Sequence, residues 1–198
     1  MRLTFLGHSC VLLESAGRRV LFDPGNLAGD FTGLTGLDAV LITHQHPDHA
    51  DPARLPALIE ANPQAVRYAD PQTAAQWNAT GAAGQWSVLA PGESFALGEL
   101  TVRGTGGRHA VIHPELPVVD NTVYLIDTPD RRAAFMHPGD SFYIPFEPVD
   151  VLALPTAARV APQLSDADVL EGMADTVELD AACRYAFLGN LTGLPAAS

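Results

Sequence analysis

The stretch Thr43-His44-Gln45-His46-Pro47-Asp48-His49-Ala50-Asp51 is the most informative part of the chain for the fold. It overlaps the end of Asp38–Thr43, an apolar run without alternation that predicts a buried strand. Pro52 follows Asp51 and predicts that a helix begins there, with Asp51 as its N-cap. The stretch is therefore expected to form a corner between a strand and a helix, and a strand end holds its side chains rigidly.

The spacing of the polar residues in this corner is typical of metal ligands. His44 and His46 are two residues apart and can point the same way from an extended backbone. Asp48 and His49 come after the turn at Pro47, so they can point elsewhere. One segment can thus supply two neighbouring metal positions, and imidazoles with a carboxylate suit Zn²⁺ and also Fe or Mn. A polar loop with histidines exposed by chance is the alternative interpretation.

The pattern H-x-H-x-D-H resembles the signature of the metallo-β-lactamase superfamily. The opening Leu6-Gly7-His8-Ser9-Cys10, with Phe22-Asp23-Pro24 after it, resembles a branch of simple single-domain members. That branch includes lactonases that act on a sugar-acid phosphate. The resemblance covers roughly residues 1–155 and implies an α/β (α+β) fold, a four-layer αββα sandwich with the metals at one edge of the two sheets.

The order of predicted elements agrees with this architecture. Strands come first, then helices around Leu55–Ile59 and Pro71–Asn78, then strands again. A buried strand at Val149–Leu154 and a helix at Ser165–Ala174 follow. This order favours two sheets with helices outside over a regularly alternating parallel sheet. We expect one domain over residues 1–198, because a chain of this length with 47% hydrophobic residues suits a single buried core.

Further ligands are expected from later loops. A catalytic zinc ion has about three protein ligands and an open position for water, so His44 and His46 require a partner. The superfamily takes this partner from a later loop. His109 ends a glycine-rich bend at Thr105–Arg108, and glycines let the backbone approach a crowded site. His109 is therefore the preferred third ligand, and His113, four residues on, is the alternative.

Asp48 and His49 also require partners. Phe135–Ser141 resembles the superfamily's strand-end Gly-Asp segment, which implies that Asp140 bridges both metals. A turn aspartate is the alternative interpretation. His137 could lie behind the ligands, face the substrate or be structural. In the resembling proteins, residues such as His8 and Asp23 lie close to the metals, so we interpret them as groups that orient ligands. An ordinary turn residue is an equal alternative for Asp23.

The sequence departs from the superfamily pattern near its end. The superfamily usually supplies one more histidine to the second metal from a late strand, and no histidine follows His137 here. Asn190 stands near the expected place, but an amide oxygen is a poorer zinc ligand than imidazole. Three explanations remain open. The second metal is weakly bound or absent, His113 or His137 completes the site, or the protein has lost catalysis and kept the fold.

The composition argues against several classes of partner. The net charge of −12, from 23 acidic and 11 basic residues, disfavours nucleic acid and anionic membranes. The two cysteines make no disulfide framework, and the first residues lead directly into a strand-like alternation. We therefore expect a cytoplasmic protein with a small-molecule substrate. A homo-oligomer is left open.

The sequence as a whole predicts a metal-dependent hydrolase. Zn²⁺, as one or two ions, is the expected cofactor, with Mn²⁺ or Fe as alternatives. Asp48 or Asp140 would hold a metal-activated water and take up a proton. The bond cleaved could be that of an ester, lactone, amide or phosphodiester. A non-catalytic or weakly active metal-binding protein is the main alternative, and an iron redox enzyme is a third.

Overall fold

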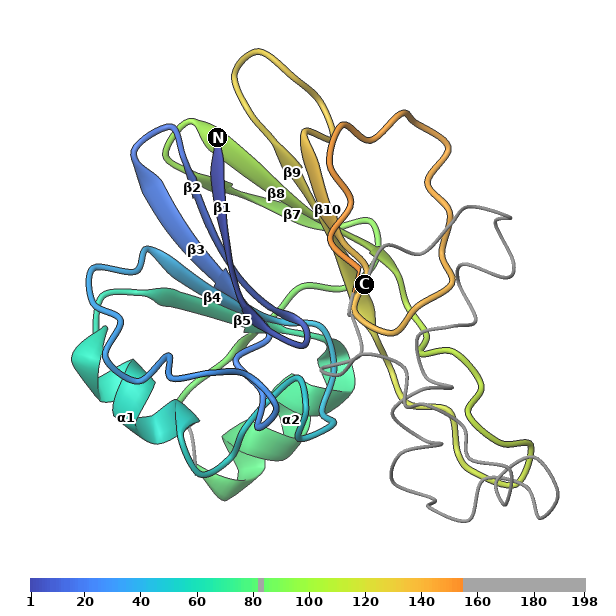
Figure 1. Ribbon diagram of the computed structural model, residues 1–198. Coiled ribbons are helices and arrows are strands. Elements are labelled where there is room, and N and C mark those ends of the chain that lie inside the picture. Colours follow the sequence, from blue (N-terminus) through green and yellow to red (C-terminus); the bar gives the residue numbers. More distant parts are fainter. Residues whose placement is uncertain (82–83, 155–198) are drawn as a thin grey trace, which may run out of the picture. The chain divides into compact units, whose positions relative to one another are not determined.

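Two β-sheets form the framework of the computed structural model, which describes residues 1–81 and 84–154 (Figure 1). The first sheet has the strand order β1-β2-β3-β4-β5-β6, and the second has the order β10-β9-β8-β7. The first three strands pair antiparallel, and β3 to β6 pair in parallel. The strands of the first sheet are β1 (Arg2–Gly7), β2 (Cys10–Ser15), β3 (Arg18–Phe22), β4 (Ala39–Ile42), β5 (Val66–Ala69) and β6 (Ser87–Val88). Those of the antiparallel second sheet are β7 (Ser94–Leu97), β8 (Leu100–Gly106), β9 (Thr122–Asp127) and β10 (Phe135–His137).

Alternate residues of the first sheet belong to two different cores. Leu13 and Val20 pack between the sheets with Val102 and Ile126 of the second sheet. The opposite face packs against the helices α1 (Leu55–Ala61) and α2 (Pro71–Thr80), which lie on the same side of the sheet (Figure 1). The described residues therefore form a helix layer and two sheet layers, and the predicted α/β sandwich is confirmed.

The outer face of the second sheet packs against residues of a later loop. Val123 and Met136 of this face pack against Tyr143 and Val149, which lie outside any helix. In residues 1–81 and 84–154, no helix covers this face. The predicted helix at Ser165–Ala174 lies outside the described residues, and so does the last part of the predicted single domain over residues 1–198.

The predicted buried strand at Val149–Leu154 is wrong. The segment makes one isolated parallel bridge, between Met136 and Leu152, and its residues alternate between partly buried and exposed. Val151 O accepts a hydrogen bond from Met136 N, and Ala153 N donates one to Met136 O. The segment therefore lies along the short β10 and pairs with one residue of it, which is too little for a regular strand.

The predicted N-cap of the first helix is also wrong. Helix α1 begins at Leu55 with Arg54 as its N-cap residue, three residues after Asp51. The Asp51 carboxylate accepts hydrogen bonds from Ala53 N and Arg54 N and pairs with the Arg54 guanidinium. Asp51 thus organises a separate turn ahead of the helix. No helix among the described residues is long and apolar enough to cross a membrane.

Helix α2 carries a buried carboxylate at its start. Asp70 Oδ1 accepts hydrogen bonds from Gln72 N at 3.0 Å and Thr73 N at 3.1 Å, as an N-cap does. Its other oxygen is buried without a hydrogen-bond partner. Burial, reinforced by the charge of Asp120, raises the pKa of Asp70 to about 6. The native state then binds more protons than the unfolded chain between about pH 4 and 6, so the free energy of unfolding falls as the pH rises through that range.

We expect Asp70→Asn to remove this pH dependence while keeping the cap, since asparagine is an equally good N-cap. The difference between the melting temperature of the variant and that of wild type, measured by circular dichroism, should increase by several degrees from pH 4.5 to pH 7.5. Asp130→Asn, at an exposed turn position, is the control and should follow wild type at both pH values. A constant difference between Asp70→Asn and wild type across this range would contradict the expectation.

Candidate metal centre

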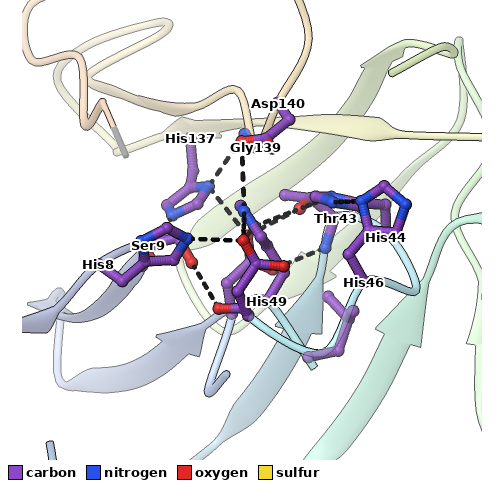
Figure 2. Close-up of polar contacts among 12 residues, drawn as sticks. His8, Ser9, Thr43, His44, His46, His49, His137, Gly139 and Asp140 are labelled. Carbon is purple, nitrogen blue, oxygen red and sulfur yellow. Dashed lines mark hydrogen bonds and ion pairs between the residues drawn. The ribbon is translucent and has the colours of Figure 1, made fainter. Parts of the chain in front are cut away.

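The ends of several strands meet at one edge of the two sheets. Thr43 and His44 follow β4 directly, Asp23 follows β3, and Asp140 comes three residues after β10. The tight turn between β1 and β2 adds His8 to the same place (Figure 2). Figure 2 shows His49 between His8 on one side and His44 on the other, with Asp140 facing it. Residues far apart in the sequence therefore form one buried polar cluster at this edge.

Three imidazoles form the first group of donors. Donor atoms of His44, His46 and His109 all lie within 4.8 Å of one another, as in a site that could hold a metal ion. His44 Nε2 lies 3.1 Å from His46 Nδ1. The His109 ring centroid is 4.7 Å from that of each of the other two. The structure thus brings together the three histidines that the sequence assigned to one position.

The backbone before His109 explains how this side chain reaches the cluster. Gly106 and Gly107 have φ values of +78° and +125°, which side-chain-bearing residues rarely adopt. His109 N then donates a hydrogen bond to Val119 O at 3.1 Å, and the ring becomes buried. His113, the alternative, is exposed and accepts a hydrogen bond from a backbone amide of its own loop. The geometry therefore selects His109.

Asp140 lies between two imidazoles. Its Oδ1 is 3.2 Å from His49 Nε2, and its Oδ2 is 3.3 Å from His109 Nε2. Asn121 Oδ1 holds this loop by accepting a hydrogen bond from Asp140 N at 3.0 Å. Gly139 has φ +55°, and a Cβ there would lie 2.4 Å from the Thr43 hydroxyl oxygen. The loop can therefore approach β4 closely only with glycine at this position.

Asp48 and His49 belong to a second group of donors, which includes His8. Donor atoms of these three residues lie within 4.8 Å of one another, and all three side chains are buried. His8 Nε2 is 3.0 Å from Asp48 Oδ2. Donor atoms of His44, His49 and Asp140 also lie within 4.8 Å of one another and form a third group. The groups share members, so the cluster offers two adjoining cation positions.

A hydrogen-bond network behind the cluster orients its histidines. Asp23 Oδ2 accepts a hydrogen bond from His49 Nδ1 at 2.7 Å, which turns His49 Nε2 toward Asp140. Thr43 donates to both oxygens of Asp23, from its backbone N at 2.8 Å and from its hydroxyl at 2.7 Å. The same hydroxyl lies 3.0 Å from His44 Nδ1. Asp23 is thus more than a turn residue, as carboxylates behind histidine ligands commonly are.

Two nitrogen atoms of the donor set are buried without hydrogen-bond partners among the described residues, and they bear on its fit to a metal ion. His49 Nε2 and His109 Nε2 are buried and make no hydrogen bond of good geometry in the described residues, although both face Asp140. His109 Nδ1 donates to Ala110 O at 2.6 Å, which leaves the Nε2 lone pair facing the cluster. Buried polar atoms without partners are costly in a folded protein. A cation between these atoms would satisfy them, so the donors fit a metal ion.

The charges of the cluster also suit a cation. Burial and the neighbouring histidines hold the pKa values of His44 and His46 below the ordinary range. Burial alone would raise the pKa of Asp48, but the hydrogen bond from His8 and the charge of His49 lower it to about 2. The close approach of His109 and His49 and the charge of His49 hold the pKa of Asp140 well below its ordinary value despite burial. Neutral imidazoles at His44 and His46 and ionised carboxylates are protonation states that metal ligands require. Despite burial, the charges of Asp23 and Asp140 raise the pKa of His49 to about 10, so His49 would release a proton on binding a metal.

The remaining candidates have other positions. His137 is buried, lies parallel to the Phe22 ring at 5.2 Å between centroids, and donates from Nε2 to Ser9 O at 2.8 Å. These contacts make it structural support for the β1–β2 turn. Asn190 lies outside the described residues. The sequence did not indicate that Thr43 and Asn121 hold Asp23, His44 and Asp140 in place by hydrogen bonds. The only signals were their positions, Thr43 beside His44 and Asn121 directly before β9.

Comparison with known proteins shows the family to which the chain belongs. A model of the beta-lactamase superfamily domain matches residues 2–179. The chain belongs to the metallo-β-lactamase superfamily. Within it, the Mycobacterium tuberculosis protein Rv0786c is 55% identical over 158 residues, 80% of this chain and 72% of the relative. A Xanthobacter autotrophicus protein named UPF0173 metal-dependent hydrolase is 29% identical over 153 residues, 71% of this chain and 62% of the relative.

Solved structures agree with this membership. The metallo-beta-lactamase fold protein YhfI of Bacillus subtilis matches with a TM-score of 0.55 and 21% identity, over 76% of this chain and 68% of YhfI. At this identity the likeness concerns the fold alone. The chain therefore shares the superfamily's framework, and its chemistry has to be argued from its own residues.

Proposed function

We propose that this chain is a metal-dependent hydrolase acting on a small molecule. The observation that carries the proposal is the set of three donor groups at the sheet edge, of which the group with Asp140 shares His44 with one and His49 with the other. The name of the Xanthobacter autotrophicus relative, a metal-dependent hydrolase, gives it independent support. Asp140 would contact both metal positions, the first held by His44, His46 and His109, and the second by Asp48, His49 and Asp140.

Zinc is the metal we propose, with manganese or iron as alternatives, because the first position has three imidazole donors. When bound, such a metal lowers the pKa of a water molecule and polarises the oxygen of the bond to be cleaved. The protein's own part is to hold the donors in place, through Asp23 behind His49 and Ala110 O behind His109.

Asp48 and Asp140 are the groups we assign to the attacking water. Both carboxylates have a lowered pKa, so both are ionised at neutral pH and act as hydrogen-bond acceptors. A carboxylate with a pKa of about 2 is a weak base at neutral pH, so Asp48 is better suited to orient the water than to store its proton.

The proposed substrate is an ester, lactone, amide or phosphodiester, since a metal-activated water can attack each of them. The fold does not select among these bonds. The acidic composition supports a small molecule over nucleic acid as the substrate, and we keep the cytoplasm as the proposed compartment because Cys10 is a free thiol.

His44→Ala tests the proposal. His44 belongs to two of the donor groups, so its loss should lower metal content and reduce hydrolysis by at least about a hundredfold. The assay loads full-length protein with Zn²⁺ and measures turnover of a panel of ester, lactone, amide and phosphodiester substrates. His113→Ala removes an exposed imidazole outside these groups and should match wild type. The proposal fails if loaded wild type turns over no substrate and His44→Ala changes only stability.

A further inference from the structure

We propose that His8 is a direct ligand of the second metal position, beside Asp48, His49 and Asp140. This inference rests on the proposed function, because it assigns a further residue to the same centre. It also answers a question raised by the sequence, in which no histidine follows His137 to complete the second position.

The distances place His8 where a ligand would stand. Its Nε2 is 3.0 Å from Asp48 Oδ2, and the donor atoms of His8, Asp48 and His49 lie within 4.8 Å of one another. Ligand atoms about 2.1 Å from a tetrahedral zinc ion are about 3.4 Å apart, so these separations suit a shared ion. The His8 and His49 rings meet edge to face with their centroids 5.3 Å apart. His8 and His49 thus approach Asp48 from different directions.

The backbone at His8 has an unusual conformation that delivers the side chain. Gly7 and His8 have φ values of +110° and +54° at the turn between β1 and β2. A positive φ is uncommon for a residue with a side chain, although histidine adopts it more readily than most. His8 is only 2% exposed although it lies in a hairpin turn. A polar residue in a hairpin turn usually faces solvent. At this turn, the His8 imidazole is instead buried in the cluster.

The other histidines of the chain are engaged elsewhere. The chain has seven in all. His44, His46 and His109 make the first group, and His49 already belongs to the second. His137 donates from Nε2 to Ser9 O, and the exposed His113 receives a hydrogen bond from its own loop. Among the described residues, His8 is consequently the further imidazole whose position suits the second metal.

A rival explanation is that His8 only orients Asp48 by a hydrogen bond. His8→Gln separates the two roles, because the glutamine amide keeps an N–H donor at about the reach of Nε2 but is a poor zinc ligand. Metal-free full-length protein is titrated with Zn²⁺ against a competing chelator. If His8 is a ligand, the variant should bind its first ion as wild type does and its second about a hundredfold or more weakly. Unchanged affinity for the second ion would overturn the inference.

Proton NMR of the cobalt-loaded protein counts the imidazoles that bind the metal. If His8 only orients Asp48, its replacement would leave this number unchanged. Each imidazole bound to Co²⁺ contributes one exchangeable, strongly shifted N–H signal. Wild type should show one such signal more than His8→Gln at full loading, while His113→Gln should match wild type. Equal numbers in wild type and His8→Gln would overturn the inference even if affinity changes.

These readouts do not depend on catalysis. Hydrolysis by the same zinc-loaded wild-type sample is measured in parallel. A sample that binds two ions and loses the second in His8→Gln, yet hydrolyses nothing, would contradict the proposed function and support the assignment of His8. If wild type hydrolyses substrate and His8→Gln binds both ions as wild type does, the proposed function is supported and the assignment of His8 is contradicted.

Discussion

Replacing Asp140 with asparagine is expected to leave the chain with at most one tightly bound metal ion and to reduce hydrolysis more than any other single change. Asp140 Oδ1 faces His49 and Oδ2 faces His109, so one carboxylate serves both donor groups. Asparagine keeps the volume and the backbone hydrogen bond to Asn121 Oδ1 but removes the charge. Loss of a group that only supports the ligands lowers activity by up to about a hundredfold. Loss of an anionic donor shared by both positions should lower it by more than that.

The metal content of Asp140→Asn, measured by plasma mass spectrometry after dialysis, checks this expectation alongside the hydrolysis assay. Asp130→Asn makes the same chemical change at an exposed turn position ten residues earlier, and it should keep wild-type metal content and activity. Two ions bound to Asp140→Asn with wild-type affinity would show that the carboxylate does not bridge the positions.

The largest effect on folding is expected from Gly25→Ala. A Cβ at this position would lie 1.7 Å from Asp48 O and 2.6 Å from His49 N, both of them backbone atoms that cannot rotate away. Hydrogen bonds from Asn26 N to Pro47 O and from Arg54 Nη2 to Gly25 O hold the two segments together. Overpacking of this kind costs about 1–3 kcal/mol or more, and relief requires the ligand corner itself to move.

Gly25→Ala should therefore lower both the free energy of unfolding, measured by urea titration of the metal-free protein, and the affinity for metal. Gly33→Ala is the matched control, because a Cβ at Gly33 meets no atom within 4 Å and its φ is not positive. If Gly25→Ala unfolds at the same urea concentration as Gly33→Ala and binds metal normally, the close approach is not needed for the site.

Local patterns in the sequence were sufficient to predict the strand that leads into the corner and the donors within the corner, but not the start of the helix after it. The apolar run before His44 specifies a buried strand, and the spacing of His44, His46, Asp48 and His49 specifies a cluster of donors. Glycines before His109 favoured it over His113, and their positive φ values explain why. The helix predicted at Pro71–Asn78 corresponds to α2, which spans Pro71–Thr80, and its proline suits the first position of a helix.

What could not be predicted depends on contacts between distant segments. The proximity of His8 to Asp48 joins residues 40 positions apart and depends on a left-handed turn residue that no local pattern indicates. Thr43 and Asn121 looked like ordinary polar residues until their hydrogen bonds to Asp23 and Asp140 were seen. Val149–Leu154 has the composition of a buried strand, but the neighbouring β10 is too short to pair with it fully.

Anomalous X-ray diffraction from crystals of the zinc-loaded protein tests the central claim most directly, because it locates the ions themselves. The account predicts one ion about 2.0–2.3 Å from donor atoms of His44, His46 and His109, and a neighbouring ion bound by Asp48 and Asp140. Crystals of loaded protein with no ion at this edge of the sheets, or with ions bound only elsewhere, would contradict it.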